Sequence, residues 1–559
     1  MALADVDRIC VVIGRTRHGM VQMEIQEAAR QGARLIEVRL DFLKKAPDFK
    51  RLLENKSCPM LATVRRPPDG GKYDDSEDAR QKLLRQAIVS GFDWVDLETD
   101  IADKIPRFGP VRRIVSYHNF REMPADLEKI HEAMCKQDSD IVKVVVRAQH
   151  PNDNLRVLEL VKKGPKPTVA FCMGDLGFPS RILQAKYGAP FTYAAFNKER
   201  NIAPGMPSFA EVKRIYHYYE INADTAVYGV IGDPISHSLS PVIHNTAFRK
   251  LGINAVYLPF RVPRDTLPAF LKAYEALPVA GYSVTIPQKE AAAEAATTRD
   301  ETVERTGAAN TLIRVDREVF SAHNTDYDGV LESLRAFLPT FNTLPSGSGE
   351  IVPAATITAR VQLPPGALTS RPADPGSTDI TQAPYAARRV EGPEPSPAAI
   401  ANRVVLVLGA GGIARAVAHA LHREGALVTI ANRTTDRAQE LAHEVGCRYV
   451  EWKARHGVLC DLLVNCTSVG MHPNVDEMPV HPSYLKPGLI VFDTVYTPEQ
   501  TLLVKEGRDR GCHVITGVEL FVRQAARQFE LFTRHVAPVD LFRDTLRRVL
   551  SPVTIRDEQ

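Results

Sequence analysis

At 559 residues the chain is too long for one hydrophobic core, so at least two domains are expected. Hydrophobic residues make up 44% and charged residues 25% of the sequence, which is typical of soluble globular proteins. The formal net charge is +3, and the basic residues are dispersed rather than interleaved with aromatic ones. This balance argues against nucleic acid as a partner and favours small-molecule substrates.

The eight cysteines show no C-x-x-C pairing and no metal-type spacing with histidine. No stretch approaches the length that crosses a membrane, and the N-terminus has no apolar signal core. We therefore expect reduced thiols, a cytoplasmic location, no metal site and no membrane partner.

Short apolar strands alternate with helical patterns from residue 9 to about 200. The eight expected strands are Ile9–Ile13, Leu35–Leu40, Met60–Val64, Trp94–Leu97, Arg113–Ser116, Ile141–Val146, Thr168–Phe171 and Phe191–Ala195. This alternation predicts a (β/α)8 TIM barrel in residues 1–220. Polar residues that interrupt or follow the strands are Glu37, Arg39, Arg65, Glu98, His118, Lys143 and Arg181. Because the carboxyl ends of barrel strands form one active face, we expect these side chains to converge there.

Lys143 stands in a β-branched run, Asp-Ile-Val-Lys-Val-Val-Val-Arg (140–147), that predicts a buried strand. A buried ammonium is costly, so this lysine is either an expensive structural residue or a nucleophile held partly as the neutral amine. His118, one strand earlier, suits proton transfer near neutral pH. Arg65 and Arg181 are candidate clamps for a substrate carboxylate and hydroxyls.

Three further residues of the expected barrel carry open alternatives. Glu37 and Arg39 alternate with apolar residues and therefore share a face. They are either a buried structural pair or ligands of substrate hydroxyls. Glu98 is either a supporting group or a strand-end carboxylate.

A second α/β pattern begins after the barrel. Residues 225–338 predict a second α/β domain, and 403–550 predict a Rossmann domain. Between them, residues 339–402 are rich in Pro, Gly, Ser, Thr and Ala, which predicts a flexible insertion.

A dinucleotide site is predicted at the start of the last domain. The strand Val404–Leu408 precedes Gly409, Ala410, Gly411, Gly412, Ile413 and Ala414, which fit G-x-G-x-x-A. After the next strand the chain offers Asn432, Arg433, Thr434 and Arg437, where NAD enzymes place an acid for the ribose diol. Cations and donors suit a 2′-phosphate, so the predicted cofactor is NADP(H).

Six segments of the first region resemble type I 3-dehydroquinate dehydratase. They are Ile-Glu-Val-Arg-Leu-Asp (36–41), Thr-Val-Arg (63–65), Ser-Tyr-His-Asn-Phe (116–120), Asp-Ile-Val-Lys (140–143), Met-Gly-Asp-Leu-Gly-Phe-Pro-Ser-Arg (173–181) and Ala-Pro-Gly (203–205). The resemblance implies that Lys143 forms an imine with the ketone of 3-dehydroquinate. Loss of a C2 proton and of the C1 hydroxyl, followed by hydrolysis, would give 3-dehydroshikimate.

Two segments depart from the pattern of that family. Asp69 stands where the family has a glutamate that orients the histidine, so its bond to His118 needs a small loop shift. Ile202 and Met206 stand where the family's lid has a hydroxyl and an amide. Their loss predicts weaker closure over the substrate and a slow site. The alternative is that the barrel is an inactive binding or stabilising module.

The region from 227 to about 550 resembles shikimate dehydrogenase. The segments are Gly-Asp-Pro-Ile-Ser-His-Ser-Leu-Ser-Pro (232–241), Ser-Val-Thr-Ile-Pro-Gln-Lys-Glu (283–290), Gly-Ala-Ala-Asn-Thr-Leu (307–312), Asn-Thr-Asp-Tyr-Asp-Gly (324–329), Leu-Gly-Ala-Gly-Gly-Ile-Ala-Arg (408–415) and Gly-Val-Glu-Leu-Phe-Val-Arg-Gln-Ala (517–525). The resemblance implies that 225–338 is a substrate-binding domain and that the C-terminal helices of 403–550 return to it. It also implies Lys289 and Asp326 as the catalytic pair. It implies substrate contacts by Ser238, Ser240, Thr285, Asn310, Tyr496 and Gln524, and cofactor contacts by Thr467 and Gly517.

The expected product of the first region, 3-dehydroshikimate, is the expected substrate of the second. The sequence therefore predicts two consecutive steps of aromatic amino-acid precursor synthesis, in the domain order of the plant-type bifunctional enzymes. A preference of the second module for quinate remains the alternative to shikimate.

Overall fold

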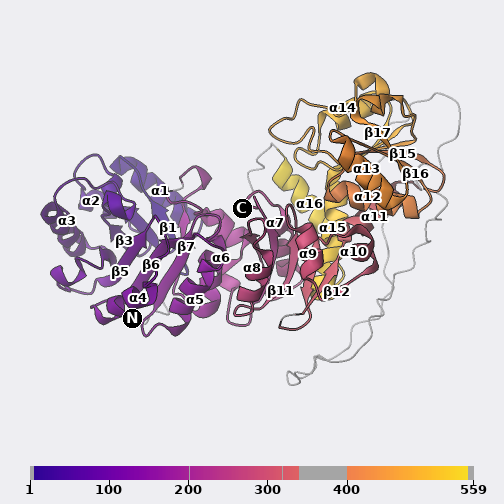
Figure 1. Cartoon of the computed structure of the whole chain (residues 1–559). Coiled ribbons are helices and arrows are strands. Elements are labelled where there is room, and N and C mark those ends of the chain that lie inside the picture. Colours follow the sequence, from indigo (N-terminus) through magenta and orange to yellow (C-terminus); the bar gives the residue numbers. More distant parts are fainter. Residues whose placement is uncertain (1–5, 201, 318, 339–399, 552–559) are drawn as a thin grey trace, which may run out of the picture.

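The computed structural model describes residues 6–200, 202–317, 319–338 and 400–551. The predicted insertion at 339–402 lies outside the described residues except for its last three positions. Three sheets follow one another along the chain, and Figure 1 shows the modules that contain them arranged in a row. Within these described ranges no helix is both long and apolar enough to cross a bilayer.

The first sheet is the predicted barrel. Its strands are β1 (Ile9–Ile13), β2 (Ile36–Arg39), β3 (Met60–Thr63), β4 (Trp94–Glu98), β5 (Arg112–Asn119), β6 (Ile141–Arg147), β7 (Thr168–Met173) and β8 (Thr192–Ala195). The order β7-β6-β5-β4-β3-β2-β1-β8 is parallel throughout. The helices around it are α1 (His18–Arg30), α2 (Phe49–Leu53), α3 (Glu77–Ser90), α4 (Leu127–Lys136), α5 (Asp153–Lys163) and α6 (Phe178–Leu183).

The barrel strand β5 is longer than the sequence pattern predicted. The expected strand ended at Ser116, whereas β5 continues to Asn119 and includes His118. The extension exists because β5 stays paired with β6, with Ser116 opposite Lys143 and His118 opposite Val145. His118 is therefore fixed by a strand rather than carried on a loop.

The second sheet, in what we call the middle domain (225–338), mixes parallel and antiparallel strands. Its strands are β9 (Ala226–Gly232), β10 (Ala255–Arg261), β11 (Val279–Val284), β12 (Thr298–Arg299), β13 (Thr311–Arg314) and β14 (Phe320–His323), in the order β10-β9-β11-β13-β14-β12. Its helices are α7 (Ser240–Lys250), α8 (Leu267–Ala273), α9 (Lys289–Ala295), α10 (Glu301–Thr306) and α11 (Thr325–Phe337).

The third sheet, in the C-terminal domain (400–551), is parallel and doubly wound. Its strands are β15 (Val404–Leu408), β16 (Leu427–Asn432), β17 (Arg448–Glu451), β18 (Leu462–Asn465), β19 (Ile490–Asp493) and β20 (His513–Ile515), in the order β17-β16-β15-β18-β19-β20. The helices are α12 (Gly412–Arg423), α13 (Thr435–Val445), α14 (Leu502–Asp509), α15 (Gly517–Thr533) and α16 (Val539–Leu550). Strand order reverses between β15 and β18, where such sheets bind dinucleotides.

The last two helices, α15 and α16, leave the third sheet and pack on the middle domain. Val522 and Phe529 of α15 share one buried apolar cluster with Tyr228 and Phe248 of that domain. Figure 1 shows α15 and α16, in yellow, lying against the middle domain. The second and third sheets are therefore connected by these helices, which follow the third sheet in the chain and pack on the second.

Candidate active sites

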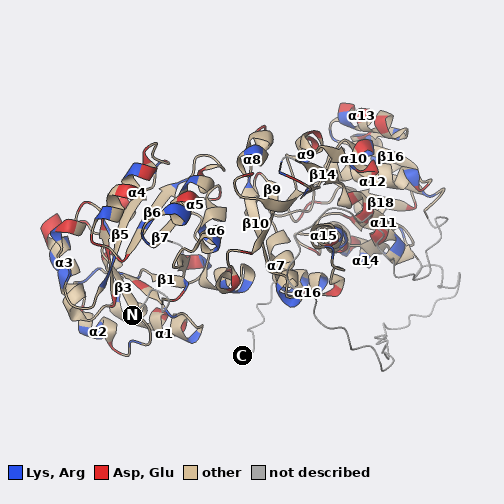
Figure 2. Ribbon diagram, turned by 90° about the horizontal axis from the view of Figure 1, so that it is seen from below, with Lys and Arg blue, Asp and Glu red and all other residues tan. Residues whose placement is uncertain are grey.

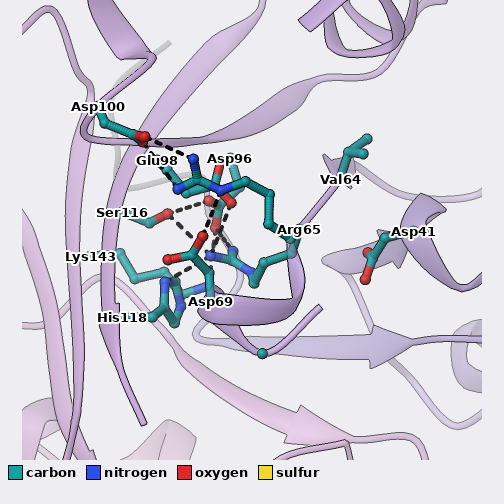
Figure 3. Close-up of polar contacts among 12 residues, drawn as sticks. Asp41, Val64, Arg65, Asp69, Asp96, Glu98, Asp100, Ser116, His118 and Lys143 are labelled. Carbon is teal, nitrogen blue, oxygen red and sulfur yellow. Dashed lines mark hydrogen bonds and ion pairs between the residues drawn. The ribbon is translucent and has the colours of Figure 1, made fainter. Parts of the chain in front are cut away.

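Lys143 is buried at the centre of a polar cluster inside the barrel. It is 5% exposed, and its Nζ donates to Asp96 Oδ2 at 3.0 Å. The same nitrogen lies 3.9 Å from the centre of the Tyr193 ring. Figure 3 shows Lys143 and His118 converging with Arg65 around Asp96.

Asp96 is the carboxylate on which this cluster converges. Besides Lys143, it lies 2.9 Å from Arg65 Nη2 and accepts a hydrogen bond from Ser116 Oγ at 2.5 Å. Burial opposes ionisation of Asp96, but Arg65 and Lys143 outweigh burial and hold the pKa of the carboxyl well below its ordinary value. Asp96 is thus a fixed anion between two cations.

His118 is held as a neutral imidazole. Burial, and then the charges of Arg65 and Lys143, keep the pKa of His118 well below its ordinary value. Arg65 Nη1 lies 2.7 Å from His118 Nδ1. Because guanidinium can only donate, Nδ1 accepts and the ring proton is on Nε2.

The expected hydrogen bond from Asp69 to His118 is not formed. Asp69 instead accepts from Arg66 Nε at 2.8 Å, and Arg66 also donates to Asp100 at 2.8 Å. The short Asp69 side chain is captured by an arginine three residues earlier on the same turn. Arg65 takes the place beside His118 that the sequence analysis gave to Asp69.

Glu37 and Arg39 do not form the buried pair that was one of the two alternatives. Arg39 donates to Asp41 at 2.9 and 2.7 Å, and both side chains are buried. Glu98 accepts from Arg80 at 2.6 Å and lies 3.6 Å from Arg65, which makes it a supporting group.

Arg181 is the exception in this cluster because no carboxylate balances its charge. Within the described ranges it forms no ion pair; its Nη1 reaches Tyr193 O at 3.5 Å and its guanidinium stacks 4.0 Å over Phe171. Burial lowers the pKa of Arg181 to about 9. A buried cation without a protein anion is suited to receive an anionic ligand.

A cavity of about 60 Å3 lies over this cluster. Its lining includes Glu37, Arg39, Arg65, Asp69, His118, Lys143, Arg181, Ile202 and Met206. Six of the seven polar residues predicted to converge therefore do so, and Glu98 lies behind Arg65. Ligand pockets usually measure several hundred cubic ångströms, so this cavity is small, and Ile202 and Met206 contribute apolar side chains to its lining.

A second polar site lies where the middle domain meets the glycine loop of the C-terminal domain. Lys289 Nζ and Asp326 Oδ2 are 2.5 Å apart, at the starts of α9 and α11. A Cβ at Gly412 would lie 3.4 Å from Lys289 Cδ. The charged pair therefore faces the glycine loop of the third sheet.

The neutral residues predicted to contact the substrate divide into two groups. Asn310 bonds Thr325 through both ends of its amide, at 3.0 Å and 2.8 Å, and so fixes the start of the helix that carries Asp326. The others are half-buried or buried: Ser238, Ser240, Thr285, Tyr496 and Gln524. Tyr496 stacks on Phe521 with ring centres 4.7 Å apart.

The hydroxyl of Ser283 has a hydrogen-bond partner on each side. Tyr257 OH donates to Ser283 Oγ at 2.5 Å, and Ser283 Oγ donates to Gln528 Oε1 at 2.8 Å. Gln528 belongs to α15, so this chain of bonds ties the middle domain to the returning helix.

The glycine loop and the cations after β16 fit a phosphorylated dinucleotide. Gly409 has φ +113, and space around Gly411 is open, so backbone can approach a pyrophosphate at the start of α12. Arg433 and Arg437 are exposed and form no ion pair within the part of the chain that the structure describes. Asn432 Nδ2 donates a hydrogen bond to Thr434 O at 2.9 Å.

Thr467 and Gly517 lie on the other side of the predicted dinucleotide site. Thr467 Oγ1 donates to Asn465 Oδ1 at 2.7 Å. Gly517 begins α15, where a Cβ would fall 2.4 Å from Val495 O. Only glycine allows this close approach.

Comparisons with known proteins agree with this geometry. A family model described as type I 3-dehydroquinase matches residues 9–223. Models of the shikimate dehydrogenase substrate binding domain, of shikimate / quinate 5-dehydrogenase and of the shikimate 5'-dehydrogenase C-terminal domain match 230–312, 395–471 and 517–547. A bifunctional 3-dehydroquinate dehydratase/shikimate dehydrogenase of Arabidopsis thaliana, chloroplastic, is 33% identical over 96% of this chain and 83% of that protein.

The chain belongs to the bifunctional 3-dehydroquinate dehydratase/shikimate dehydrogenase family. The Chlamydia pneumoniae shikimate biosynthesis protein AroDE is 26% identical over 93% of this chain and 94% of that protein. A solved structure of dehydroquinate dehydratase and shikimate dehydrogenase from S. pombe AroM is 21% identical and covers 97% of this chain and 98% of that one, with a TM-score of 0.40. The predicted fold class and the two predicted enzyme activities are confirmed.

Two buried acids of this dehydratase–dehydrogenase were missed by sequence reasoning. Asp96 was hidden in Trp-Val-Asp-Leu-Glu (94–98), although it shares its strand face with Glu98 two residues later. Asp493 ends β19, and burial raises its pKa to about 6. It accepts from Thr501 Oγ1 at 2.6 Å and from Asn465 Nδ2 at 3.0 Å, and Asn465 in turn holds Thr467.

Proposed function

We propose that the dehydratase reaction runs through an imine on Lys143. The observation that supports this most directly is the placement of Lys143 beside Asp96 and His118 under a cavity that Arg181 also lines. The lysine is the cavity's buried amine, the histidine is a neutral base, and the arginine is an uncompensated cation. These are the groups that a ketone bearing a carboxylate requires.

Lys143 passes its extra proton to His118 and attacks as the neutral amine, and His118 gives this proton back to the hydroxyl that later leaves the carbinolamine as water. The C3 ketone of 3-dehydroquinate becomes a carbinolamine, and loss of water gives an iminium. His118 removes a C2 proton through Nδ1, its unprotonated nitrogen, which gives up the hydrogen bond from Arg65 as it does so. The electrons flow to the iminium nitrogen and form an enamine. The enamine electrons then expel the C1 hydroxyl, which leaves as water with the proton returned by His118, and the iminium forms again. Water then hydrolyses the imine, which releases 3-dehydroshikimate and the free amine. Asp96 stays ionised throughout and holds Lys143 on the cavity floor.

Arg181 is assigned to the substrate carboxylate. A bound carboxylate would provide the anion that this buried guanidinium lacks. Arg65 is less suited to that task because Asp96 and Glu98 already balance its charge and its Nη1 bonds His118. We assign Arg65 to holding His118 and Asp96 in place.

The dehydratase assignment is tested with the full chain because α6 of the barrel packs against the middle domain. Lys143→Ala and His118→Ala should each abolish dehydratase turnover while NADP-dependent oxidation of shikimate continues at the parent rate. Parent-like dehydratase activity in Lys143→Ala would refute the imine. A parent chain without any dehydratase turnover would instead favour the inactive-module alternative.

The second module is proposed to reduce 3-dehydroshikimate to shikimate. When bound, NADPH supplies the hydride. Lys289 donates a proton to the oxygen that becomes the new hydroxyl, and Asp326 holds the Lys289 ammonium in place. Ser238, Ser240, Thr285 and Gln524 are the neutral hydrogen-bond partners for the carboxylate and hydroxyls of the substrate.

The cofactor of the dehydrogenase is NADP(H). Shikimate dehydrogenases of Methanopyrus kandleri and Methanosarcina acetivorans are named for NADP(+) and are 36% and 33% identical over 58% of this chain. The glycine loop 409–414 would hold the pyrophosphate. Arg433 and Arg437 would hold the 2′-phosphate, with Asn432 and Thr434 beside them.

Shikimate is favoured over quinate because Ser238 and Ser240 are retained at the start of α7. Comparing the oxidation of both substrates with NADP decides between them. A higher kcat/KM for quinate would overturn the preference.

We further propose the domain division 1–220, 225–338, 339–402 and 403–550, which the three separate sheets support. A cytoplasmic location is proposed on the ground that all eight cysteines are free thiols.

A further inference from the structure

The barrel has a seam between β7 and β8. These strands end the sheet order, and within the described strands no ladder joins them. Arg181 lies across this seam, with its guanidinium over Phe171 of β7 and its Nη1 directed at Tyr193 O of β8. The short helix α6, which carries Arg181, therefore covers the place where the barrel is not closed by backbone bonds.

Arg181 has few bonds of its own that fix its position. In the described part of the chain its guanidinium makes one hydrogen bond, 3.5 Å long, and its Nε is buried without a partner. The placement of the guanidinium therefore depends on the backbone of α6. Because bidentate binding of a carboxylate is sensitive to displacement, a small shift of α6 would weaken it.

Asn154 ties α6 to two loops of the active face. Its Oδ1 accepts from the backbone N–H of Ser180, the residue before Arg181, at 3.2 Å. Its Nδ2 donates to Leu176 O at 2.7 Å and to Pro151 O at 2.8 Å. Pro151 lies in the loop after the Lys143 strand, so one buried amide connects both loops to the helix of Arg181.

The middle domain joins this network through Tyr274. This residue follows α8 and is fully buried, and its hydroxyl donates to Pro151 O at 3.0 Å. On the same side, α6 packs against β10, and Leu183 of α6 shares a buried apolar cluster with Phe260 of β10. Figure 2 shows α6 facing β10 across the boundary between the modules.

We propose that Tyr274, a residue of the dehydrogenase half, is a positioning residue for the dehydratase site. Through Pro151 and Asn154 it fixes α6 and thereby the guanidinium of Arg181. The inference rests on the proposed role of Arg181 in binding the substrate carboxylate. It makes the dehydrogenase half a structural part of the dehydratase's substrate site, in addition to consuming its product.

Tyr274→Phe in the full chain tests this inference because it removes only the hydroxyl. The KM for dehydroquinate should rise about three- to tenfold, the change expected for one ordinary hydrogen bond, while kcat stays within about twofold. The kinetics of shikimate oxidation should match those of the parent. The control is Tyr282→Phe: Tyr282 packs on the same Phe260 and Phe270 rings, at 5.8 Å from each, and should leave every constant unchanged.

The effect should also disappear where Arg181 is already altered. Arg181→Lys should raise the KM for dehydroquinate, and adding Tyr274→Phe to it should raise KM little further. An unchanged KM in Tyr274→Phe, or parallel losses in both activities, would overturn the inference while leaving the role of Arg181 intact. An unchanged KM in Arg181→Lys would instead refute the proposed carboxylate site itself.

Discussion

Asp96 Oδ2 lies 3.0 Å from Lys143 Nζ, and both side chains are nearly inaccessible to solvent. The pair resolves the problem of a lysine inside a strand, because the buried ammonium has a buried carboxylate as its partner. Arg65 Nη2 approaches the same oxygen, Asp96 Oδ2, at 2.9 Å, so one carboxylate pairs with two cations. The dehydratase thus keeps its nucleophile at a fixed point of the barrel floor.

Replacing Asp96 by asparagine should damage the dehydratase far more than the dehydrogenase. The variant leaves Lys143 and Arg65 without their shared anion, and breaking a buried pair costs about 3–5 kcal/mol. We expect dehydratase kcat to fall at least about tenfold and the first thermal transition to move down. Dehydratase kinetics and calorimetry measure both effects, and Glu98→Gln is the matched control. Parent-like kcat in Asp96→Asn would contradict the central position given to this carboxylate.

Restoring polar groups to the lid should improve substrate binding by the dehydratase. Ile202 and Met206 line the cavity with apolar atoms, so closure excludes water without donating to the substrate. Met206→Gln or Ile202→Ser should lower the KM for dehydroquinate by about fivefold, the value of one hydrogen bond. Met206→Leu is the control, and it should leave KM unchanged. An equal KM in all three variants would show that the lid does not reach the substrate.

The barrel could be predicted from the sequence because its two signals are local. Apolar strands alternate with helical patterns, and polar residues stand within or just after the strands. The partners of Asp69 and Arg39 could not be predicted. Each was decided by a nearby charged group, Arg66 or Asp41, that competes for the same atoms. Asp96 was missed because one acid in a mixed strand resembles a surface residue until its neighbours are known. The docking of α6 on β10 depends on tertiary packing between modules, which no local pattern encodes.

Arg433 should decide the preference of the dehydrogenase for NADP over NAD. It is exposed just after β16, and no carboxylate pairs with it among the described residues. Arg433→Ala should raise the KM for NADPH about tenfold or more, since charge-assisted bonds are worth roughly twice neutral ones. The KM for NADH should change little. Arg510→Ala removes an arginine that pairs with Glu506 on α14, and it serves as the control. Equal effects on both cofactors would contradict a 2′-phosphate site.

His244 should make the middle domain sensitive to acid. Burial lowers the pKa of His244 to about 3, and both ring nitrogens lack partners in the described structure. Its folded pKa lies below the unfolded value of about 6.5, so stability is complete above pH 6.5 and is lost as pH falls toward 3. In this window the slope contributed by His244 is about 1.4 kcal/mol per pH unit.

Thermal scans between pH 6.5 and 4.5 test this slope by comparison of the parent with His244→Leu. The leucine variant should lose less stability over the window, because it carries no group to protonate. The control is His131→Leu, which removes a second buried histidine, one that has Thr168 as a hydrogen-bond partner. Identical pH dependence in the parent and His244→Leu would contradict a neutral, unpartnered His244.

The most direct test of the account is to trap the imine. The full chain is incubated with 3-dehydroquinate and sodium borohydride, and the modified peptide is located by mass spectrometry. The account predicts one reduced adduct on Lys143, with loss of dehydratase but not dehydrogenase activity, and no adduct in Lys143→Ala. Turnover by the parent without any adduct at Lys143, or an adduct on another lysine that persists in Lys143→Ala, would contradict it.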